Sequence, residues 1–369
     1  MSSVLAVVKV GSSTLVGADG NIDYAYISGL CQQVAALMGE GHRIVVVSSG
    51  AVAAGRSRLG LAKRPSDIPS LQACAAAGQA ALTDAYAEVL AQHGIPCAQV
   101  LLTRRDVTDR EGYLNARNTL ERLLELGAVP VVNENDTVSV AEFAFGDNDM
   151  LGAIVSALLS ADLYVICSDV DGLYTANPAT DPTATRINRV ERVDASISGM
   201  AEGAGSAVGT GGMVTKLRAA RAMLTAGIPM LICHGRQEGV IVDAVHGEDV
   251  GTRFEAPAGS SHGSSLKLWI GLAEVSRGSI TLDAGAAKAV LERGASVLPV
   301  GVVATEGSYT AGDVIDVLDM DGTVLGRGVT RYSSDDMVRV RGLKLDIIAR
   351  FMPEHAGQPA VHRDELLVF

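Results

Sequence analysis

Val7-Val8-Lys9-Val10-Gly11-Ser12-Ser13 joins an apolar run to a Gly-Ser-Ser turn and places a lysine inside the run. The aliphatic and β-branched residues around Lys9 predict a buried strand. A buried lysine costs free energy unless an anion meets it, and the turn two residues later adds donors for one. We therefore interpret Lys9 as a functional cation rather than as a lysine that snorkels into solvent.

Apolar runs of strand length recur at residues 4–10, 44–47, 98–102, 129–132, 163–167 and 229–233. Stretches with helical spacing lie between them, at residues 24–38, 71–91, 115–126, 149–159 and 213–226. This alternation predicts an α/β fold in which helices cover both faces of a largely parallel sheet. The 4% of aromatic residues, against 48% hydrophobic residues, favours this class over a β-sandwich.

Polar or Gly-rich segments follow four of the predicted strands: Gly11-Ser12-Ser13, Ser48-Ser49-Gly50, Asn133-Glu134-Asn135-Asp136 and Ser168-Asp169. Ligands of parallel sheets bind beyond the carboxyl ends of the strands. We therefore expect these segments to converge on one edge of the sheet and to form the binding site there.

A second cationic segment, Gly209-Thr210-Gly211-Gly212-Met213-Val214-Thr215-Lys216, precedes a predicted helix. Glycines let backbone N–H groups turn toward an anion, and the start of a helix adds its positive dipole end. The run fits neither the Walker A pattern nor the GxGxxG fingerprint. A plain surface loop remains the alternative, so the phosphate-binding interpretation depends on the rest of the site.

Two lysines around one phosphate suit phosphoryl transfer, in which the protein mainly neutralises charge. Two acidic clusters lie between Lys9 and Lys216 in the sequence, at residues 133–136 and 146–149. Their carboxylates and amides could hold a cationic substrate group or magnesium-bound water, or they could be turns and helix N-caps. The seven histidines are dispersed, and we find no hydrolase triad and no zinc motif.

The length, the net charge and the cysteine pattern exclude further classes of protein. A chain of 369 residues favours two domains, and a net charge of −12 argues against a protein that coats nucleic acid or an anionic membrane. The five cysteines form no CxxC pair, which is typical of a reducing compartment. Without a signal-peptide pattern or an apolar stretch of membrane-spanning length, we expect a soluble, cytoplasmic protein.

The composition changes after a segment rich in Pro, Gly and Ser. We predict a larger domain at residues 1–257, a linker at 258–272, a small β-rich domain at 273–353 and a C-terminal tail at 354–369. In the small domain we expect a helix at 284–293 and further short segments at 298–303, 313–318, 323–329 and 337–340, with turns between them.

These motifs resemble those of the glutamate 5-kinase family. The matching segments include the two lysine runs, Ser48-Ser49-Gly50-Ala51-Val52-Ala53-Ala54-Gly55, Leu101-Leu102-Thr103, Val132 to Asp136, Phe145 to Asp149 and Ser168 to Tyr174. The C-terminal part is similar to a PUA domain, with Gly326-Arg327-Gly328-Val329 followed by Tyr332-Ser333-Ser334. The resemblance therefore covers nearly the whole chain.

The resemblance implies the amino-acid kinase fold, a three-layer αβα sandwich, followed by a small PUA pseudobarrel. It implies the transfer of a phosphoryl group from ATP, with Mg²⁺, to the γ-carboxylate of L-glutamate as the first step of proline biosynthesis. Feedback inhibition by proline and a homodimer or homotetramer are implied as well.

The resemblance also implies roles for individual residues. Lys9 and Lys216 would stabilise the transferring phosphoryl group, and Asp149 would hold the two lysines. The glutamate-binding residues would be Ser49, Gly50, Asn133, Asp136, Asp147 and Asn148. The ATP-binding residues would be Lys9, Gly11, Ser12, Ser168, Asp169, Thr210, Gly211, Gly212, Met213, Val214, Thr215 and Lys216. We assign no metal ligands, since phosphates and water can hold magnesium.

Two alternatives stay open at this point. The first is another member of the same family, such as an acetylglutamate, aspartate or uridylate kinase. The second is an RNA-binding protein, because residues 327–350 hold six Lys or Arg against three Asp. A solvated surface of mixed charge is the favoured explanation of that segment, given the net charge of −12.

Overall fold

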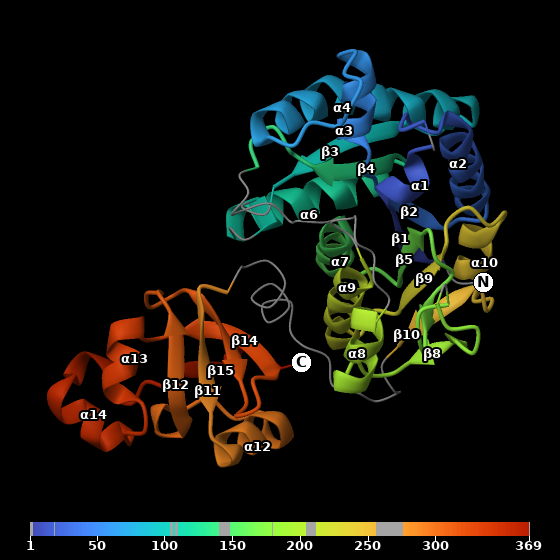
Figure 1. Ribbon diagram of the computed structural model, residues 1–369. Helices are drawn as coiled ribbons and strands as arrows, with labels where there is room; N and C mark the ends of the chain where they lie inside the picture. Colours follow the sequence, from blue (N-terminus) through green and yellow to red (C-terminus); the bar gives the residue numbers. More distant parts are fainter. Residues whose placement is uncertain are drawn as a thin grey trace. The chain divides into compact units, whose positions relative to one another are not determined.

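An eight-stranded sheet forms the centre of the N-terminal part of the computed structural model (Figure 1), in the order β3-β4-β2-β1-β5-β9-β10-β8. The neighbouring strands from β3 to β9 pair in parallel, and β10 is antiparallel to β9. The mostly parallel sheet predicted from the alternation is therefore confirmed. Its strands are β1 (Leu5–Val10), β2 (Arg43–Val47), β3 (Cys97–Leu102), β4 (Val129–Glu134), β5 (Leu163–Ser168), β8 (Arg189–Val190), β9 (Met230–His234) and β10 (Gly251–Phe254).

The chain divides into two compact units, residues 1–261 and 262–369. The structure describes residues 3–17, 19–103, 106–107, 110–139, 148–178, 180–203, 212–255 and 276–368. The predicted linker, 258–272, lies outside these ranges, as do Asp147, Thr210 and Gly211. Among the described residues, no helix combines the length and the apolar character needed to cross a membrane.

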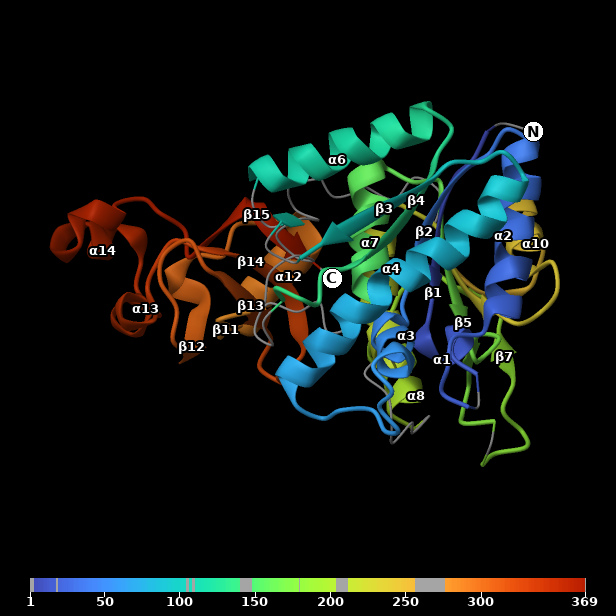
Figure 2. The ribbon, with the colours of Figure 1, turned by 90° about the horizontal axis from the view of Figure 1, so that it is seen from above.

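Helices cover both faces of the central sheet, as Figures 1 and 2 show. On one face, β1 contributes Ala6, Val8 and Val10 to a core that includes residues of α2, α4 and α10. On the other face, α7 lies against β1 and packs on α9. The helices of this unit are α1 (Ser12–Leu15), α2 (Tyr24–Gly39), α3 (Ala51–Arg58), α4 (Ile68–Gln92), α6 (Arg110–Glu125), α7 (Asn148–Leu159), α8 (Ala195–Gly203), α9 (Met213–Ala226) and α10 (Val240–His246).

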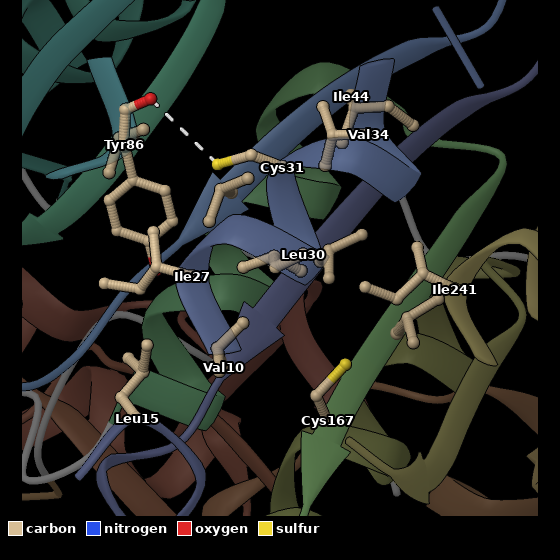
Figure 3. Packing of buried hydrophobic residues seen from close by; sticks show 14 of the residues in the cluster. Val10, Leu15, Ile27, Leu30, Cys31, Val34, Ile44, Tyr86, Cys167 and Ile241 are labelled. Atoms are coloured by element: carbon tan, nitrogen blue, oxygen red, sulfur yellow. Dashed lines mark hydrogen bonds between the residues drawn. The ribbon is translucent and has the colours of Figure 1, made fainter. Parts of the chain in front are cut away.

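Figure 3 shows how the core of the first face is filled. Ile27 and Leu30 of α2 lie beside Val10 of β1 and the fully buried ring of Tyr86 of α4. The Cys31 thiol also faces α4, 4.0 Å from the Tyr86 carbonyl oxygen. All five cysteines are free, and four of them are buried, so they act here as small apolar side chains.

The parallel strands bring their carboxyl ends to one edge of the sheet. Lys9 of β1 pairs in register with Val47 of β2 and with Ile166 of β5, so the residues that follow these strands emerge side by side. Val47 in turn pairs with Val132 of β4. The four polar segments expected to converge, after β1, β2, β4 and β5, therefore follow neighbouring strands at this edge.

The second unit contains a five-stranded sheet with the order β12-β11-β13-β14-β15, in which only β11 and β13 pair in parallel. Its elements are β11 (Gly278–Leu282), α12 (Ala284–Arg293), the 3-10 helix η1 (Pro299–Gly301), β12 (Val302–Gly307), β13 (Val314–Leu318), β14 (Val324–Thr330), α13 (Ser334–Val340), α14 (Leu345–Phe351), η2 (Pro353–His355) and β15 (Val361–Val368). A short hairpin in the first unit joins β6 (Leu173–Tyr174) to β7 (Arg186–Ile187).

Two segments of the second unit differ from the expectation. Residues 337–340 are the end of helix α13, which begins after Ser333, whose side-chain oxygen accepts the backbone N–H of Asp336. The capping serine and the two acidic residues in the first turn favour a helix here, although the apolar residues Met337, Val338 and Val340 would also fit a strand. Residues 361–368, expected in a tail, form edge strand β15, because Val361, Leu366 and Leu367 are buried in the core.

Candidate active site

Lys9 and Lys216 meet at one carboxylate. The Nζ atom of Lys9 lies 2.5 Å from Oδ1 of Asp149, and the Nζ atom of Lys216 lies 3.3 Å from Oδ2. Lys9 comes from β1, Asp149 from the first turn of α7 and Lys216 from α9. The three residues are 5%, 0% and 6% exposed. The predicted juxtaposition of the two lysines with Asp149 is thus present in the structure.

Asp149 stays ionised despite its burial. Desolvation disfavours its charge, but the ion pairs with Lys9 and Lys216 and the hydrogen bonds from Lys9 and Thr215 together lower the pKa of the carboxyl below its ordinary value. The Thr215 hydroxyl lies 2.9 Å from Oδ2. With two ammonium groups on one carboxylate, the cluster carries a net charge of +1, which is suited to an anionic ligand.

The backbone of α7 is fixed next to this cluster. The Tyr164 hydroxyl of β5 donates a hydrogen bond of 2.7 Å to the carbonyl of Asp149. A Cβ atom at Gly152 would lie 2.3 Å from that hydroxyl, so glycine is needed for helix and strand to approach this closely. Tyr164 of the sheet therefore helps to fix the position of Asp149. The sequence analysis did not identify Tyr164.

The described part of the Gly-rich run begins at Gly212, the N-cap of α9. Gly212 supplies no side-chain cap to the first turn of this helix, and the Thr215 hydroxyl donates to the Gly212 carbonyl at 2.8 Å. The turn therefore presents backbone N–H groups and the positive end of the helix dipole beside Lys216. Gly209, Thr210 and Gly211 lie outside the described residues.

Three predicted substrate-binding residues are joined by hydrogen bonds. Nδ2 of Asn148 lies 2.8 Å from the Ser48 carbonyl, 2.9 Å from Oγ of Ser49 and 3.0 Å from Oδ1 of Asn133. Gly50, the N-cap of α3, has φ of +97°, a conformation that side chains strongly disfavour. The ends of β2 and β4 and the start of α7 therefore form one polar group.

Asp136 lies near this group beside a hollow of about 280 Å³ between α4, β3 and the segment after β4. Gln79, Gln99, Glu134 and Asp136 line it together with several alanines. Burial raises the pKa of Asp136 to about 6, with a further contribution from the negative charge of Glu134. Two acidic side chains around a small hollow suit a ligand that carries an ammonium group.

The other predicted nucleotide-binding residues, Gly11, Ser12, Ser168 and Asp169, lie at the carboxyl ends of β1 and β5. The Ser168 hydroxyl donates to Oδ1 of Asp169 at 3.0 Å, and the N–H of Gly11 reaches the Cys167 carbonyl at 3.4 Å. A Cβ atom at Gly11 would lie 3.4 Å from Nζ of Lys9, in the space next to the ammonium group. Ser12 is exposed at the start of α1. The backbone of Gly11 therefore lies close to the Lys9 ammonium group.

Gln79 is a functional candidate that the sequence analysis missed. It belongs to the buried face of α4, among alanine, glycine and leucine residues, and its Oε1 accepts a hydrogen bond of 2.9 Å from Nδ2 of Asn133. The sequence does contain a signal for Gln79, namely an isolated polar residue on the apolar face of an Ala-rich helix. Its hydrogen-bond partner, Asn133, can be identified only from the structure.

One group of potential metal-ligand side chains lies away from this edge, at the opposite ends of the strands. Glu40, His42 and His246 place their ligand atoms within 4.8 Å of one another. However, Nδ1 of His42 accepts the backbone N–H of Val4 at 3.1 Å, so the ring carries its proton on Nε2. Nε2 then faces Glu40 as a donor rather than as a metal ligand.

Comparison with known proteins places the chain in a family. The profile of the Amino acid kinase family matches residues 5–234, and that of the PUA domain matches residues 278–352. Glutamate 5-kinases of Geobacter sp. (strain M21) and Myxococcus xanthus (strain DK1622) are each 45% identical over 362 residues. These matches cover 98% of this chain and 96% and 95% of the relatives. The chain belongs to the glutamate 5-kinases of the amino acid kinase family.

More distant relatives agree with this assignment. The glutamate 5-kinase of Dehalococcoides mccartyi (strain CBDB1) is 42% identical over 365 residues, which are 98% of this chain and 97% of that one. Among solved structures, the carbamate kinase from Giardia lamblia bound to AMP-PNP has a TM-score of 0.51 at 14% identity, covering 69% of this chain and 99% of that one. This likeness supports the kinase fold of the first unit.

Proposed function

We propose that the chain transfers the γ-phosphoryl group of ATP to the side-chain carboxylate of L-glutamate and forms L-glutamyl 5-phosphate, the first step of proline biosynthesis. One structural observation carries the proposal: two buried lysines from distant parts of the chain converge on Asp149 at the carboxyl edge of the sheet. The glutamate 5-kinase relatives, which match nearly the full length, support the choice of acceptor.

In this proposal, the two lysines lower the barrier of the transfer. A glutamate carboxylate oxygen attacks the γ-phosphorus, the bond from this phosphorus to the bridging oxygen breaks, and ADP leaves with that oxygen. Lys9 and Lys216 neutralise the charge on the transferring group, while Asp149 keeps both ammonium groups in place. A glutamate side chain titrates near pH 4.3, so the nucleophile is already ionised and requires no general base.

The ATP-binding side of the proposed site comprises Gly11, Ser12, Ser168, Asp169 and the start of α9, Gly212 to Lys216. We include Thr210 and Gly211, which precede Gly212 in the sequence. The ammonium groups of Lys9 and Lys216 and the backbone N–H groups at the start of α9 suit phosphates. The carboxylate of Asp169 would offer an oxygen ligand to Mg²⁺, and a bound Mg²⁺ would help to neutralise the charge of the phosphates.

The acceptor side of the proposed site comprises Ser49, Gly50, Asn133, Asp136 and Asn148, with Asp147 next to them in the sequence. We assign Asp136 to the α-ammonium of glutamate, because it and Glu134 place two acids beside one hollow. An acid at this position is of no use to a kinase whose substrate has a masked amine, and this distinguishes the proposal from an acetylglutamate kinase.

A glutamate-dependent ADP release assay with hydroxylamine as the trap tests the proposal. We expect ADP release to require glutamate and to match the hydroxamate formed from the acyl phosphate. N-acetylglutamate, aspartate and UMP serve as alternative acceptors in the same assay. Faster turnover with any of these three than with glutamate would contradict the proposed acceptor.

We further propose that proline inhibits the enzyme, that it assembles as a homodimer or homotetramer, and that it works in the cytoplasm. The family resemblance supports all three, and the five free cysteines fit a reducing compartment. Adding proline to the same assay tests the inhibition, and light scattering of the purified chain tests the assembly. Full activity at high proline concentration would contradict the first proposal, and a monomer the second.

A further inference from the structure

A chain of side-chain hydrogen bonds runs from the proposed acceptor site through α4 to the edge strand β3. Asn148 donates to Oδ1 of Asn133 at 3.0 Å, and Asn133 donates to Oε1 of Gln79 at 2.9 Å. Gln79 then donates to the Thr83 hydroxyl at 3.3 Å. The single proton of that hydroxyl faces two acceptors, Oε1 of Gln99 at 2.8 Å and the Gln79 carbonyl at 3.1 Å. The amides of Asn148, Asn133 and Gln79 each donate to the next side chain, away from Asn148.

Backbone groups fix this direction. The N–H of Glu134 donates to Asn133 at 2.9 Å, and since an N–H can only donate, the Asn133 atom that faces it is the oxygen. The Ser48 carbonyl can only accept, so the Asn148 atom at 2.8 Å from it is the nitrogen. The opposite atom of the Asn133 amide, its nitrogen, must then face Gln79.

The direction matters for the substrate. With Nδ2 of Asn148 held by Ser48, Ser49 and Asn133, its Oδ1 is the atom that this side chain can present to a ligand. An oxygen suits the α-ammonium of an amino acid, whereas a flipped amide would present a donor of like polarity. The cationic end of glutamate would then be recognised by Asn148 and Asp136 together.

We propose that Gln79 is a positioning residue for glutamate binding: the backbone sets which way the Asn133 amide faces, and Gln79 holds its nitrogen so that the Asn133 side chain stays in place against Asn148. The inference rests on the proposed function, since it concerns the same acceptor site. Gln79 and Asn133 are only 9% and 2% exposed, so water does not readily replace the Gln79 oxygen. Without that oxygen, the buried Asn133 nitrogen loses its acceptor, and a shift of the side chain toward another acceptor would weaken its contact with Asn148.

The variant Gln79→Met removes the acceptor and keeps a side chain of similar length. We expect it to raise the KM for glutamate about tenfold, as the loss of one buried hydrogen-bond partner does, and to leave the KM for ATP unchanged. The matched control is Gln33→Met on helix α2, because Oε1 of Gln33 likewise accepts one hydrogen bond, in this case from the backbone N–H of Ile241 at 3.0 Å. The control should leave both KM values unchanged.

A double-mutant cycle separates positioning from general loss of structure. If Gln79 acts through Asn133, then Gln79→Met should add nothing to the glutamate KM of Asn133→Ala. Additive effects, or an equal rise in the KM for ATP, would overturn the inference. If Gln79→Met does not fold, Thr83→Val is the second test, because it removes the hydroxyl to which Gln79 donates. We expect Thr83→Val to raise the glutamate KM by a smaller factor than Gln79→Met would. No rise in the glutamate KM would overturn the inference.

Activity of the wild type and of Gln79→Met distinguishes the proposed function from the role of Gln79. If the wild-type chain forms no hydroxamate with glutamate, the proposed function fails and the acceptor must be sought again. If the wild type is active and Gln79→Met has the wild-type glutamate KM, only the role of Gln79 fails.

Discussion

Asp149 holds two distant side chains together in the candidate site. Its two oxygens hold ammonium groups that are 207 positions apart in the sequence, Lys9 and Lys216. A buried charge of this kind is tolerated because it is fully paired and hydrogen-bonded. Removing either lysine therefore changes both the charge offered to the substrate and the balance at Asp149.

The variant Lys216→Ala should lower kcat by roughly 10² or more, as the loss of a preorganised charge donor does. Steady-state kinetics at saturating ATP and glutamate measure the effect, with Lys344→Ala, an exposed lysine of the second unit, as the control. A folded Lys216→Ala variant with near-wild-type turnover would remove Lys216 from the catalytic machinery.

The raised pKa of Asp136 makes glutamate binding dependent on pH. Burial and the charge of Glu134 raise this pKa from 3.8 to about 6, so the carboxylate loses its charge as the pH falls through 6. We expect the KM for glutamate to rise over the same range, because the neutral acid attracts an ammonium group less strongly. A KM that stays constant between pH 7.5 and 5.5 would argue against this pairing.

The same shift predicts a conflict between stability and binding at Asp136. A carboxyl whose pKa is higher in the folded than in the unfolded state contributes its stabilisation below about pH 4 and loses it as the pH rises through 6. Asp136→Asn should therefore stabilise the fold at pH 8, by at most about 3 kcal/mol, while it raises the glutamate KM. Thermal unfolding at pH 8 and pH 4 tests this, because the gain must shrink at the lower pH.

At the scale of single residues, much of the site could be predicted because strand ends and glycine runs are visible in the sequence. Lys9 stood out as a charge inside an apolar run, and the structure pairs it with Asp149. Gln79 and Tyr164 could not be found in this way, since their importance depends on partners 54 and 15 residues away. Such partners are brought together only by the crossover connections of the sheet.

Among the elements, helices α3 and α4 pack tightly against each other. A Cβ atom at Gly78 would lie 2.0 Å from the Ala51 carbonyl oxygen and 2.3 Å from the Gly55 nitrogen. Because these neighbours are backbone atoms, a side chain can be accommodated only if the helices separate. Helix α3 begins directly after Ser49 and Gly50, so this contact supports the proposed acceptor site.

Gly78→Ala should destabilise the fold by about 1–3 kcal/mol, as overpacking of a tight contact does. Gly29→Ala in α2 is the matched control, since its Cβ would meet no atom within 4 Å, and it should stabilise its helix by about 0.5–1 kcal/mol. Chemical denaturation of the two variants measures both effects. Equal stability of Gly78→Ala and the wild type would show that the helices can separate without cost.

The elements of the central sheet could be predicted because apolar runs and helical spacing alternate cleanly there. Helix α9 has the predicted bounds, Met213–Ala226. Helix α3 was not anticipated, because its sequence of Ala, Gly and Arg lacks an apolar stripe and its stability comes from packing on α4. Helix α13 was not anticipated either, since three apolar residues in a segment of four, Met337, Val338 and Val340, fit a strand as well as a helix.

At the scale of the whole molecule, the described contacts of the proposed site all come from the first unit. Lys9, Asp149 and Lys216 and their partners belong to residues 1–261. A chain that ends at residue 261 should therefore keep glutamate-dependent ADP release, because a unit with its own core can fold alone. A truncated chain that folds but releases no ADP would show that the PUA unit contributes to catalysis.

The position of β1 has a consequence for synthesis of the protein. This strand pairs with β2 on one edge and with β5 on the other, yet Leu163, where β5 begins, follows long after Val10. At a translation rate of about 5–20 residues per second, β5 emerges roughly 8–30 s after β1. During that interval the nascent chain exposes an apolar strand edge, so conditions that slow translation there should favour aggregation of this kinase before its central sheet is complete.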